Sequence, residues 1–292
     1  MVPIRFGVEL SNYGPSADRE SLQRTASACE RLGYQSLWLS DHLVMPHHCD
    51  SHYPFSDSGT IENWSPTDAW YEPVACMPLL LEATSTIEVG TAVLLAGLRQ
   101  PIVLAKQLAT IDAFYGGRVA LGIGAGWMRE EIEALNVDFT TRGARLDEWV
   151  EVLRQCWTGQ PMGFSGSHYV LPPDVYAYPT PVRDIPLLVG GTSKAALRRA
   201  ANVGGWFALY RPEEDPVVRL TQDVVTLQES ADACGRQFSD IRIVLSVDAP
   251  DRVTEHLGHL AALGVTDITI EVGTLEAAER NYALLADAAI AA

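Results

Sequence analysis

The sequence is poor in positive charge, with 21 Lys and Arg residues against 37 Asp and Glu residues and a formal net charge of −16. Surfaces that bind nucleic acid or anionic membranes need clustered Lys and Arg side chains. The composition therefore argues against both partners. A small molecule is left as the expected binding partner.

Cysteines are also few, and none of them forms a Cys-x-x-Cys pair. The five cysteines stand at positions 29, 49, 76, 156 and 234. An odd and scattered set predicts reduced thiols rather than a disulfide framework. No apolar run approaches the roughly 20 residues needed to span a bilayer, and residues 1–5 lack the start of a secretory signal. We expect a soluble, cytoplasmic protein.

The chain alternates regularly between strand-like and helix-like segments. Apolar and alternating patterns predict eight strands, at residues 4–10, 35–40, 87–95, 118–123, 186–189, 206–209, 241–247 and 267–271. Helices are predicted at residues 18–32, 69–83, 101–115, 146–157, 194–202, 216–233, 254–263 and 275–289. Eight strands with intervening helices predict an α/β fold, a single (β/α)8 TIM barrel over residues 1–292.

Two long segments interrupt this alternation, at residues 44–64 and 159–184. They are predicted to be insertions after strands 2 and 4. Long loops in a compact domain are usually functional lids or disordered. These two are rich in Tyr, Trp, Phe and His, which favours lids over a binding site.

A glycine-rich strand end is the most informative local pattern. Residues 116–127 read Gly-Gly-Arg-Val-Ala-Leu-Gly-Ile-Gly-Ala-Gly-Trp, so Gly122, Gly124 and Gly126 remove side chains where a strand ends. Something must approach that backbone closely. The pattern does not end in Gly-Lys-Ser/Thr, so it is not that phosphate loop. It is not a dinucleotide fingerprint either, because position 127 is Trp and no third glycine falls at the required spacing.

Asp41 and His42 directly follow the second predicted strand, where a barrel collects its catalytic groups. Histidine exchanges protons near neutral pH, and an aspartate can orient it or bind a ligand. The alternative is that Asp41 caps a turn and His42 is an ordinary loop histidine.

Residues 188–194, Leu-Val-Gly-Gly-Thr-Ser-Lys, combine a strand end, a glycine turn and a helix start. Backbone N–H groups at such a helix start suit an anion such as phosphate. The alternative is an ordinary helix cap by Thr192 or Ser193. Barrel phosphate sites also more often follow the seventh and eighth strands, whereas this strand is the fifth.

Other polar clusters have simpler interpretations. His47, His48, Cys49 and His52 match no standard zinc spacing, and we interpret them as a polar, mobile lid without metal.

Arg142 and Arg145 could reach a ligand phosphate, but pairing with acids such as Glu148 or Asp138 is the favoured interpretation. Three glutamates, at positions 130, 131 and 133, begin a helix, where the helix dipole is a sufficient explanation for them.

Taken together, several motifs resemble the bacterial-luciferase-like flavin superfamily, and their order and spacing cover nearly the whole chain. They are Ser40-Asp41-His42, Gly90-Thr91-Ala92-Val93, residues 101–112, residues 116–127 and residues 190–193. Within the superfamily, the Asp-His pair and the Gly-x-Gly-x-Gly-Trp run followed by Glu-Glu resemble the branch that uses the deazaflavin coenzyme F420 rather than FMN.

The resemblance implies a deazaflavin ring lying across the strand ends, with its phosphate-bearing tail on Gly190, Gly191, Thr192 and Ser193. It implies a non-proline cis peptide between Ala92 and Val93 that buttresses the ring. Gly124, Gly126 and Trp127 are expected beside the coenzyme. Asp41 matches the residue that hydrogen-bonds the deazaflavin, and His42 matches the histidine beside the reacting ring carbon.

The implied function is transfer of a hydride between F420 and a small organic substrate by a homodimeric oxidoreductase, with His42 as the proton partner. Trp127 replaces the glutamate proton donor of the family's sugar-phosphate dehydrogenases, which argues against a sugar phosphate. We expect the substrate to meet Glu9, Asn12 and residues 53–64 and 169–178.

Three alternatives stay open. The first is an FMN-dependent monooxygenase that is supplied by a separate flavin reductase. The second is a catalytically silent flavin-binding barrel. The third, a metal-dependent hydrolase, depends only on the cluster between His47 and His52.

Overall fold

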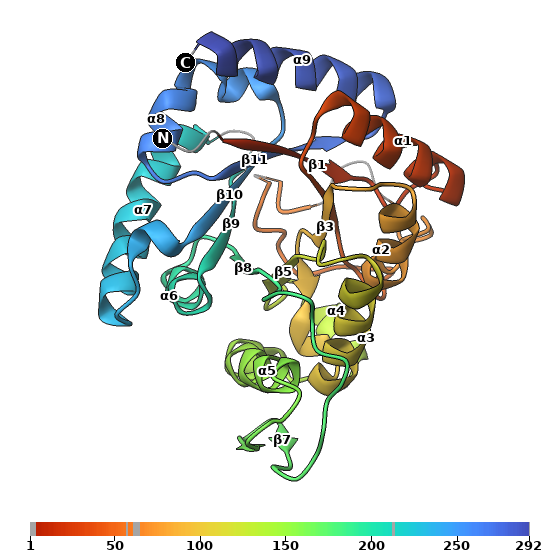
Figure 1. Ribbon diagram of the computed structural model, residues 1–292, viewed down its shortest axis with the longest axis vertical. Coiled ribbons are helices and arrows are strands. Elements are labelled where there is room, and N and C mark those ends of the chain that lie inside the picture. Colours follow the sequence, from red (N-terminus) through yellow and green to blue (C-terminus); the bar gives the residue numbers. More distant parts are fainter. Residues whose placement is uncertain (1–3, 57, 61–64, 212–213, 292) are drawn as a thin grey trace.

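Parallel strands form the centre of the computed structural model, and helices cover them on the outside (Figure 1). The structure describes residues 4–56, 58–60, 65–211 and 214–291. The central strands are β1 (Arg5–Leu10), β2 (Ser36–Leu39), β3 (Glu88–Thr91), β4 (Leu94–Leu95), β5 (Leu121–Gly124), β8 (Leu187–Gly190), β9 (Gly205–Leu209), β10 (Arg242–Val247) and β11 (Asp267–Val272).

The sheet order is β3-β2-β1-β11-β10-β9-β8-β5-β4, with every pair parallel. A parallel bridge between Val89 and Val119 brings the two edges together, so the sheet closes into a barrel. The predicted α/β barrel is therefore confirmed. The predicted strand at 87–95 is divided into β3 and β4, and the Ala92–Val93 peptide between them is cis.

Helices follow the strands around the outside of the barrel (Figure 1). They are α1 (Arg19–Leu32), α2 (Pro73–Glu82), α3 (Pro101–Phe114), α4 (Arg129–Ala134), α5 (Arg142–Trp157), α6 (Lys194–Val203), α7 (Pro216–Ala233), α8 (Leu257–Ala262) and α9 (Leu275–Ala291). The helix predicted at 69–83 begins only at Pro73, because Glu72 caps it by accepting from Ala75 N at 2.7 Å. The segment predicted at 254–263 begins with a 3-10 turn, Thr254–His256, before α8.

The lower part of the barrel interior is filled. Arg242 pairs with Glu88 at 2.7 Å and with Asp267 at 2.8 Å, which closes the amino ends of the strands. Above these ion pairs, Trp38 and Phe207 pack edge to face with ring centroids 5.3 Å apart. A ligand can therefore be received only at the carboxyl ends of the strands, which we call the mouth of the barrel.

The two insertions lie in different places. Residues 44–56 and 58–60 of the first run beside α4, where the N–H groups of Asp50 and Ser51 donate to Glu130 at 2.8 and 3.1 Å. Residues 57 and 61–64, also predicted to form this lid, lie outside the described residues.

The second insertion joins α5 to β8 and contains a short hairpin of β6 (Phe164–Ser165) and β7 (Val170–Leu171). Three of its backbone N–H groups donate to Glu148 of α5, and Lys106 of α3 donates to the carbonyl of Tyr178. Figure 1 shows β7 beyond α5, away from the strands. The prediction that residues 169–178 meet the substrate is therefore wrong. The βα loops form the mouth, whereas this segment is an αβ connection.

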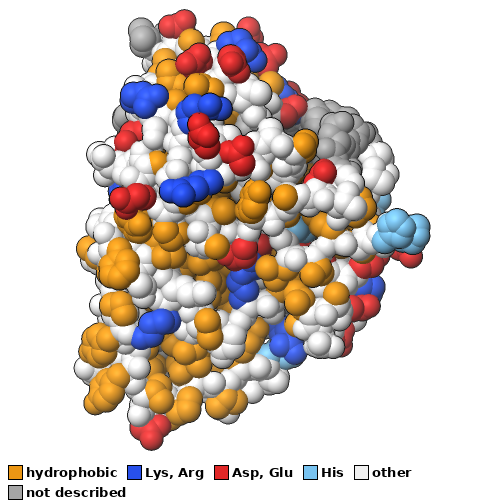
Figure 2. Space-filling model, turned by 90° about the vertical axis from the view of Figure 1, so that its right-hand side faces the viewer, with side chains coloured by type: hydrophobic (Ala, Val, Ile, Leu, Met, Phe, Trp, Pro, Cys, Tyr) orange, Lys and Arg blue, Asp and Glu red, His pale blue; other side chains and the backbone are white. Residues whose placement is uncertain are grey.

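Hydrophobic side chains gather over the lower part of the face in Figure 2, and charged ones are more frequent at its top. Exposed apolar residues of α3 and the second insertion include Val103, Phe114, Tyr176 and Tyr178.

Candidate active site

His42 and Glu131 form a hydrogen-bonded pair at the mouth of the barrel. Nδ1 of His42 lies 2.7 Å from Oε2 of Glu131, and both side chains are largely buried. The other oxygen of Glu131 accepts from the N–H groups of Leu43 at 2.5 Å and Val44 at 3.4 Å. Because carboxylate oxygens accept hydrogen bonds, this contact favours the tautomer of His42 with its hydrogen on Nδ1. Nε2, which has no hydrogen bond within the described ranges, is then an acceptor.

The interpretation of Glu131 as a helix-end charge is wrong. Its side chain is 1% exposed and anchors the loop after β2. A helical spacing argument could have found it, because Met128, just before α4, and Ile132 mark the buried side of this helix and residue 131 projects from the same side. Glu130 binds the backbone of the first insertion and Glu133 pairs with Arg129.

Asp41 is directed into the protein. Its two carboxylate oxygens accept from Arg99 at 2.6 and 2.9 Å, and one also accepts from Leu95 N at 2.8 Å. Burial raises the pKa of Asp41, and the Arg99 guanidinium opposes that rise. Arg99 continues to Glu72 at 2.7 Å, so Asp41 connects the ends of β2 and β4 to the start of α2. Its side chain is 0% exposed, so it supports the mouth from below.

Aromatic side chains surround His42. Its ring packs edge to face on Trp70, with centroids 4.7 Å apart, and lies 6.1 Å from Trp127. Trp70 stacks on Tyr13 at 4.2 Å, and Trp127 contacts Tyr53 at 5.1 Å. Trp127 and Tyr53 belong to segments that were predicted to meet ligands, whereas Tyr13 and Trp70 were not predicted because neither belongs to a motif.

Two carboxylates complete the mouth on the side of β1 and β11. Glu9 accepts from Ser246 Oγ at 2.5 Å, and Glu271, which was not predicted, accepts from the Tyr13 hydroxyl at 2.7 Å. Burial raises the pKa of Glu9 to about 8, with the charge of Glu271 adding to the rise. Asn12 is fully buried and holds the loop after β2 through the backbone of Ser40.

The side chain of Val93 lies against the glycines at the ends of β5 and β8. A Cβ on Gly124 would lie 2.8 Å from Val93 Cγ2, and one on Gly190 would lie 3.0 Å from Val93 Cγ1. A Cβ on Gly122 would lie 2.1 Å from the carbonyl oxygen of Thr91. These glycines therefore admit the segment between β3 and β4 into the barrel interior. Ala92 and Val93 also pack against a buried cluster inside the barrel, which consists of Trp38, Ala120, Leu188, Phe207 and Val244.

The segment from Gly190 to Ser193 links β8 to α6. Ser193 caps α6 by accepting from Ala196 N at 3.2 Å, which was the alternative interpretation. Gly191 has φ +105°, and its carbonyl accepts from Trp206 Nε1 at 2.9 Å. The Thr192 hydroxyl has no hydrogen bond among the residues that the structure describes. This helix start therefore still presents a hydroxyl and backbone N–H groups.

Arg142 lies beside the end of β5. It donates to the carbonyl oxygens of Gly126 at 3.1 Å and Phe139 at 2.8 Å, and its guanidinium lies 3.7 Å from the centroid of the Phe139 ring. No acid pairs with it in the described part of the chain, so the predicted pairing with a neighbouring acid is wrong for Arg142. Its neighbour Arg145 donates to the Thr141 hydroxyl at 3.0 Å. Arg142 therefore provides unpaired positive charge close to the mouth.

Other features lie away from this site. The described residues contain no group of three or more His, Cys, Asp or Glu side chains placed to hold a metal ion.

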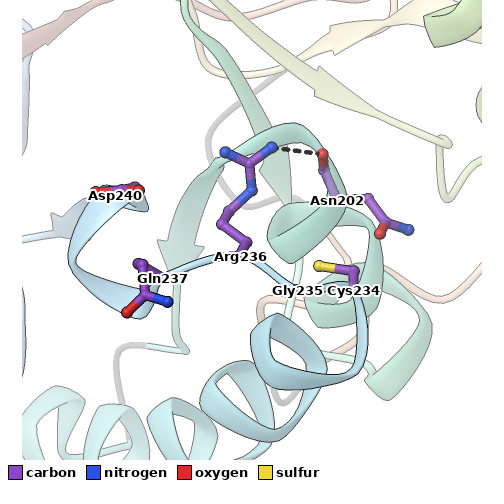
Figure 3. A pocket seen from close by; sticks show the side chains of 6 residues that line it. All are labelled: Asn202, Cys234, Gly235, Arg236, Gln237 and Asp240. Carbon is purple, nitrogen blue, oxygen red and sulfur yellow. Dashed lines mark hydrogen bonds between the residues drawn. The ribbon is translucent and has the colours of Figure 1, made fainter.

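A polar pocket between α6 and the end of α7 is lined by Asn202, Cys234, Gly235, Arg236, Gln237 and Asp240 (Figure 3). Arg236 there donates to the carbonyl of Asn202 at 3.0 Å, at the opposite end of the barrel. None of the helices described is both long enough and apolar enough to cross a membrane.

This arrangement is that of a barrel enzyme with its chemistry at the carboxyl ends of the strands. A family model described as luciferase-like monooxygenase matches residues 1–250, and the chain belongs to this family. The resemblance expected from the motifs is confirmed, and the protein is an enzyme of the oxidoreductase class.

The chain is also similar to individual proteins. An uncharacterized protein of Mycobacterium bovis is 33% identical over 245 residues, which are 84% of this chain and 82% of that protein. An F420-dependent glucose-6-phosphate dehydrogenase of Amycolatopsis mediterranei is 28% identical over 264 residues, 85% of this chain and 70% of that enzyme.

Solved structures share the fold. An F420-dependent secondary alcohol dehydrogenase, in complex with an F420-acetone adduct, superposes with a TM-score of 0.77 and 15% identity over 97% of this chain and 99% of that one. The oxygenating constituent of 3,6-diketocamphane monooxygenase of Pseudomonas putida, in complex with FMN, gives 0.73 and 14% over 97% of both chains. Similar folds therefore serve both F420 and FMN.

Proposed function

We propose that this protein transfers a hydride between coenzyme F420 and a small organic substrate, with His42 as the proton partner. The observation that carries the proposal is the His42–Glu131 pair, which holds the imidazole at the mouth with Nε2 as an acceptor. F420 supplies the ring carbon that accepts or releases the hydride. When an alcohol is oxidised, Nε2 of His42 accepts the hydroxyl proton, and in the reverse reaction it returns that proton.

The residues around the mouth fit a coenzyme with a flat ring and an anionic tail. Gly124, Gly126, Ala92 and Val93 offer backbone and small side chains to one face of a ring, and Trp127 borders it. The tail has two candidate partners, the unpaired charge of Arg142 and the helix start with Gly190, Gly191, Thr192 and Ser193. Asp41 contributes indirectly, by holding the loop ends through Arg99 and Leu95.

Fluorescence titration of the purified protein with oxidised F420, and in parallel with FMN, tests the coenzyme. We expect saturable quenching by F420 and none by FMN. Arg142→Gln should weaken F420 binding by about tenfold, the value of one charge-assisted hydrogen bond. Arg198→Gln is the control, because Arg198 lies on the exposed side of α6. Binding of FMN alone would instead indicate a monooxygenase that requires a separate flavin reductase.

His42→Ala tests the chemistry separately from binding. The variant should bind F420 as the unchanged protein does, while the rate of hydride transfer falls by about 100-fold or more, the usual range for a general acid or base. An unchanged rate would remove His42 from the mechanism. Tight F420 binding without turnover on any alcohol, ketone or imine offered would indicate the silent coenzyme-binding barrel.

We also propose that the protein is a homodimer. Val103 and Phe114 of α3 are 56% and 78% exposed, and burial of such apolar side chains against a second copy is favourable. Sedimentation equilibrium at several protein concentrations tests this, and a monomer at all of them would contradict it.

A further inference from the structure

The mouth of the barrel contains two neighbouring carboxylates that lack a cation. Glu9 of β1 and Glu271 of β11 are paired in register, and neighbouring strands lie about 4.8 Å apart. Both side chains therefore project from the same side of the sheet. Neither forms an ion pair with Lys, Arg or His in the ranges that the structure covers. Glu271 is exposed, whereas Glu9 is only partly so.

Two hydrogen bonds hold these carboxyl groups in place, and neither comes from a cation. Ser246 donates to Glu9 at 2.5 Å, and Tyr13 donates to Glu271 at 2.7 Å. Burial raises the pKa of Tyr53 to about 12, and the charges of Glu271 and Glu9 add to that rise. The charge of Glu271 adds to burial in raising the pKa of Glu9 to about 8, so Glu9 keeps a proton at neutral pH. A cation placed between the two carboxyl groups would favour the loss of that proton.

Aromatic rings continue from these carboxylates around the mouth. Tyr13 stacks on Trp70, Trp70 contacts His42, and His42 faces Trp127, which contacts Tyr53. These rings therefore line the mouth from Tyr13, beside Glu271, past His42 to Tyr53. Faces of Trp and Tyr rings attract cations, and several of them with carboxylates make a site for an ammonium group.

A buried hydroxyl without a partner lies on the same side of β11. Thr269 precedes Glu271 by two residues, so both side chains project from the same face of the strand. Its side chain is fully buried, and its Oγ1 has no hydrogen-bond partner among the described residues. Buried hydroxyls are normally satisfied, so this oxygen indicates an unseen polar group, water or ligand, within the barrel.

We propose that the substrate carries a positively charged nitrogen, a protonated amine or a quaternary ammonium, which binds between Glu9, Glu271 and the surrounding rings of Tyr13, Tyr53 and Trp70. Anionic substrates such as sugar phosphates are rejected at the same place, because they would meet the carboxylate of Glu271 and no cation paired with it among the described residues. The inference rests on the proposed function for the identity of this site as the substrate site, and its binding test does not require F420.

Three probes of nearly equal shape and different charge test the proposal: choline, 3,3-dimethylbutan-1-ol and 3,3-dimethylbutanoate. Their affinities are measured by isothermal titration calorimetry on the whole protein without coenzyme. We expect choline to bind about tenfold more tightly than the neutral alcohol, the scale of one favourable cation site, and the carboxylate not to bind. Glu271→Gln should remove most of the preference for choline while leaving the alcohol unchanged.

Glu229→Gln is the matched control, because Glu229 lies exposed on α7, outside the mouth, and should change none of the affinities. Equal affinities for choline and the alcohol, no detectable choline binding, or an unchanged preference in Glu271→Gln would each overturn the proposal. The test is independent of the coenzyme. A protein that prefers choline but does not bind F420 refutes the proposed function and keeps this inference. A protein that binds F420 but shows no preference for choline refutes this inference and keeps the proposed function.

Discussion

Replacing Glu131 by glutamine tests whether the buried carboxylate sets the proton position on His42. The present side chain accepts from His42 Nδ1 at 2.7 Å and from Leu43 N at 2.5 Å. Glutamine has one oxygen and one amide nitrogen. The oxygen must stay with Leu43, because that N–H has no other hydrogen-bond acceptor among the described residues, so the amide NH2 faces Nδ1. The imidazole hydrogen then moves to Nε2, and His42 can no longer accept a proton from the substrate.

The magnitude follows from the bonds changed. Charge-assisted hydrogen bonds contribute about 1.5–3 kcal/mol each. Glutamine replaces the charge-assisted bond to His42 with a neutral one, so the free energy of unfolding should fall by about 2 kcal/mol. The rate of hydride transfer should fall by about 10²–10⁴-fold, because the wrong tautomer leaves the proton partner unable to act.

Nitrogen-15 chemical shifts of labelled histidine report the tautomer directly and need no substrate. Glu133→Gln is the control, since Glu133 is half-exposed on the same helix and pairs with Arg129. The reasoning is refuted if the hydrogen stays on Nδ1 in Glu131→Gln, or if both variants transfer hydride at the rate of the unchanged protein.

Three further predictions concern stability. Asp41→Asn should lower the free energy of unfolding in urea by about 3 kcal/mol, because it leaves the buried Arg99 partly unpaired, and a loss below 1 kcal/mol would contradict this. Gly124→Ala should cost about 1–3 kcal/mol, since its Cβ would lie 2.8 Å from Val93, and an unchanged melting temperature would show that Val93 moves freely. The pKa of Glu9 is raised from 4.5 to about 8, so the folded protein holds a proton that the unfolded chain releases. Stability should therefore fall as the pH rises from 5 to 8, by about 1–3 kcal/mol more than in Glu9→Gln, and parallel curves for the two proteins would exclude this.

The barrel could be predicted because its signals are local. Each strand is an apolar run, and several helices carry their own cap, such as Asp18 before α1 and Ser193 before α6. The position of His42 followed from the same reasoning, because the end of a barrel strand must lie at the mouth. The second insertion was placed wrongly, because its aromatic composition was given more weight than its position after a helix.

The carboxylates and rings opposite His42 could not be predicted in the same way. Tyr13 and Glu271 are 258 positions apart and meet only because β1 pairs with β11 when the barrel closes. Trp70 joins them from the end of the loop before α2, through a bridge with Tyr13. None of these residues belongs to a motif, and their relation appears only with the register of the closed sheet.

The glycine-rich strand ends show how one pattern can have two physical causes. The run at Gly122 and Gly124 predicts a close approach, and the structure shows that Val93 and the backbone of Thr91 make that approach. A side chain at either position would therefore displace Val93 before it met any ligand. Weak coenzyme binding in such a variant would not demonstrate direct contact. Thr192→Val is the more informative change, because it removes only the hydroxyl and keeps the branched shape of the side chain. A loss of F420 affinity in this variant would therefore indicate a hydrogen bond between that hydroxyl and the coenzyme.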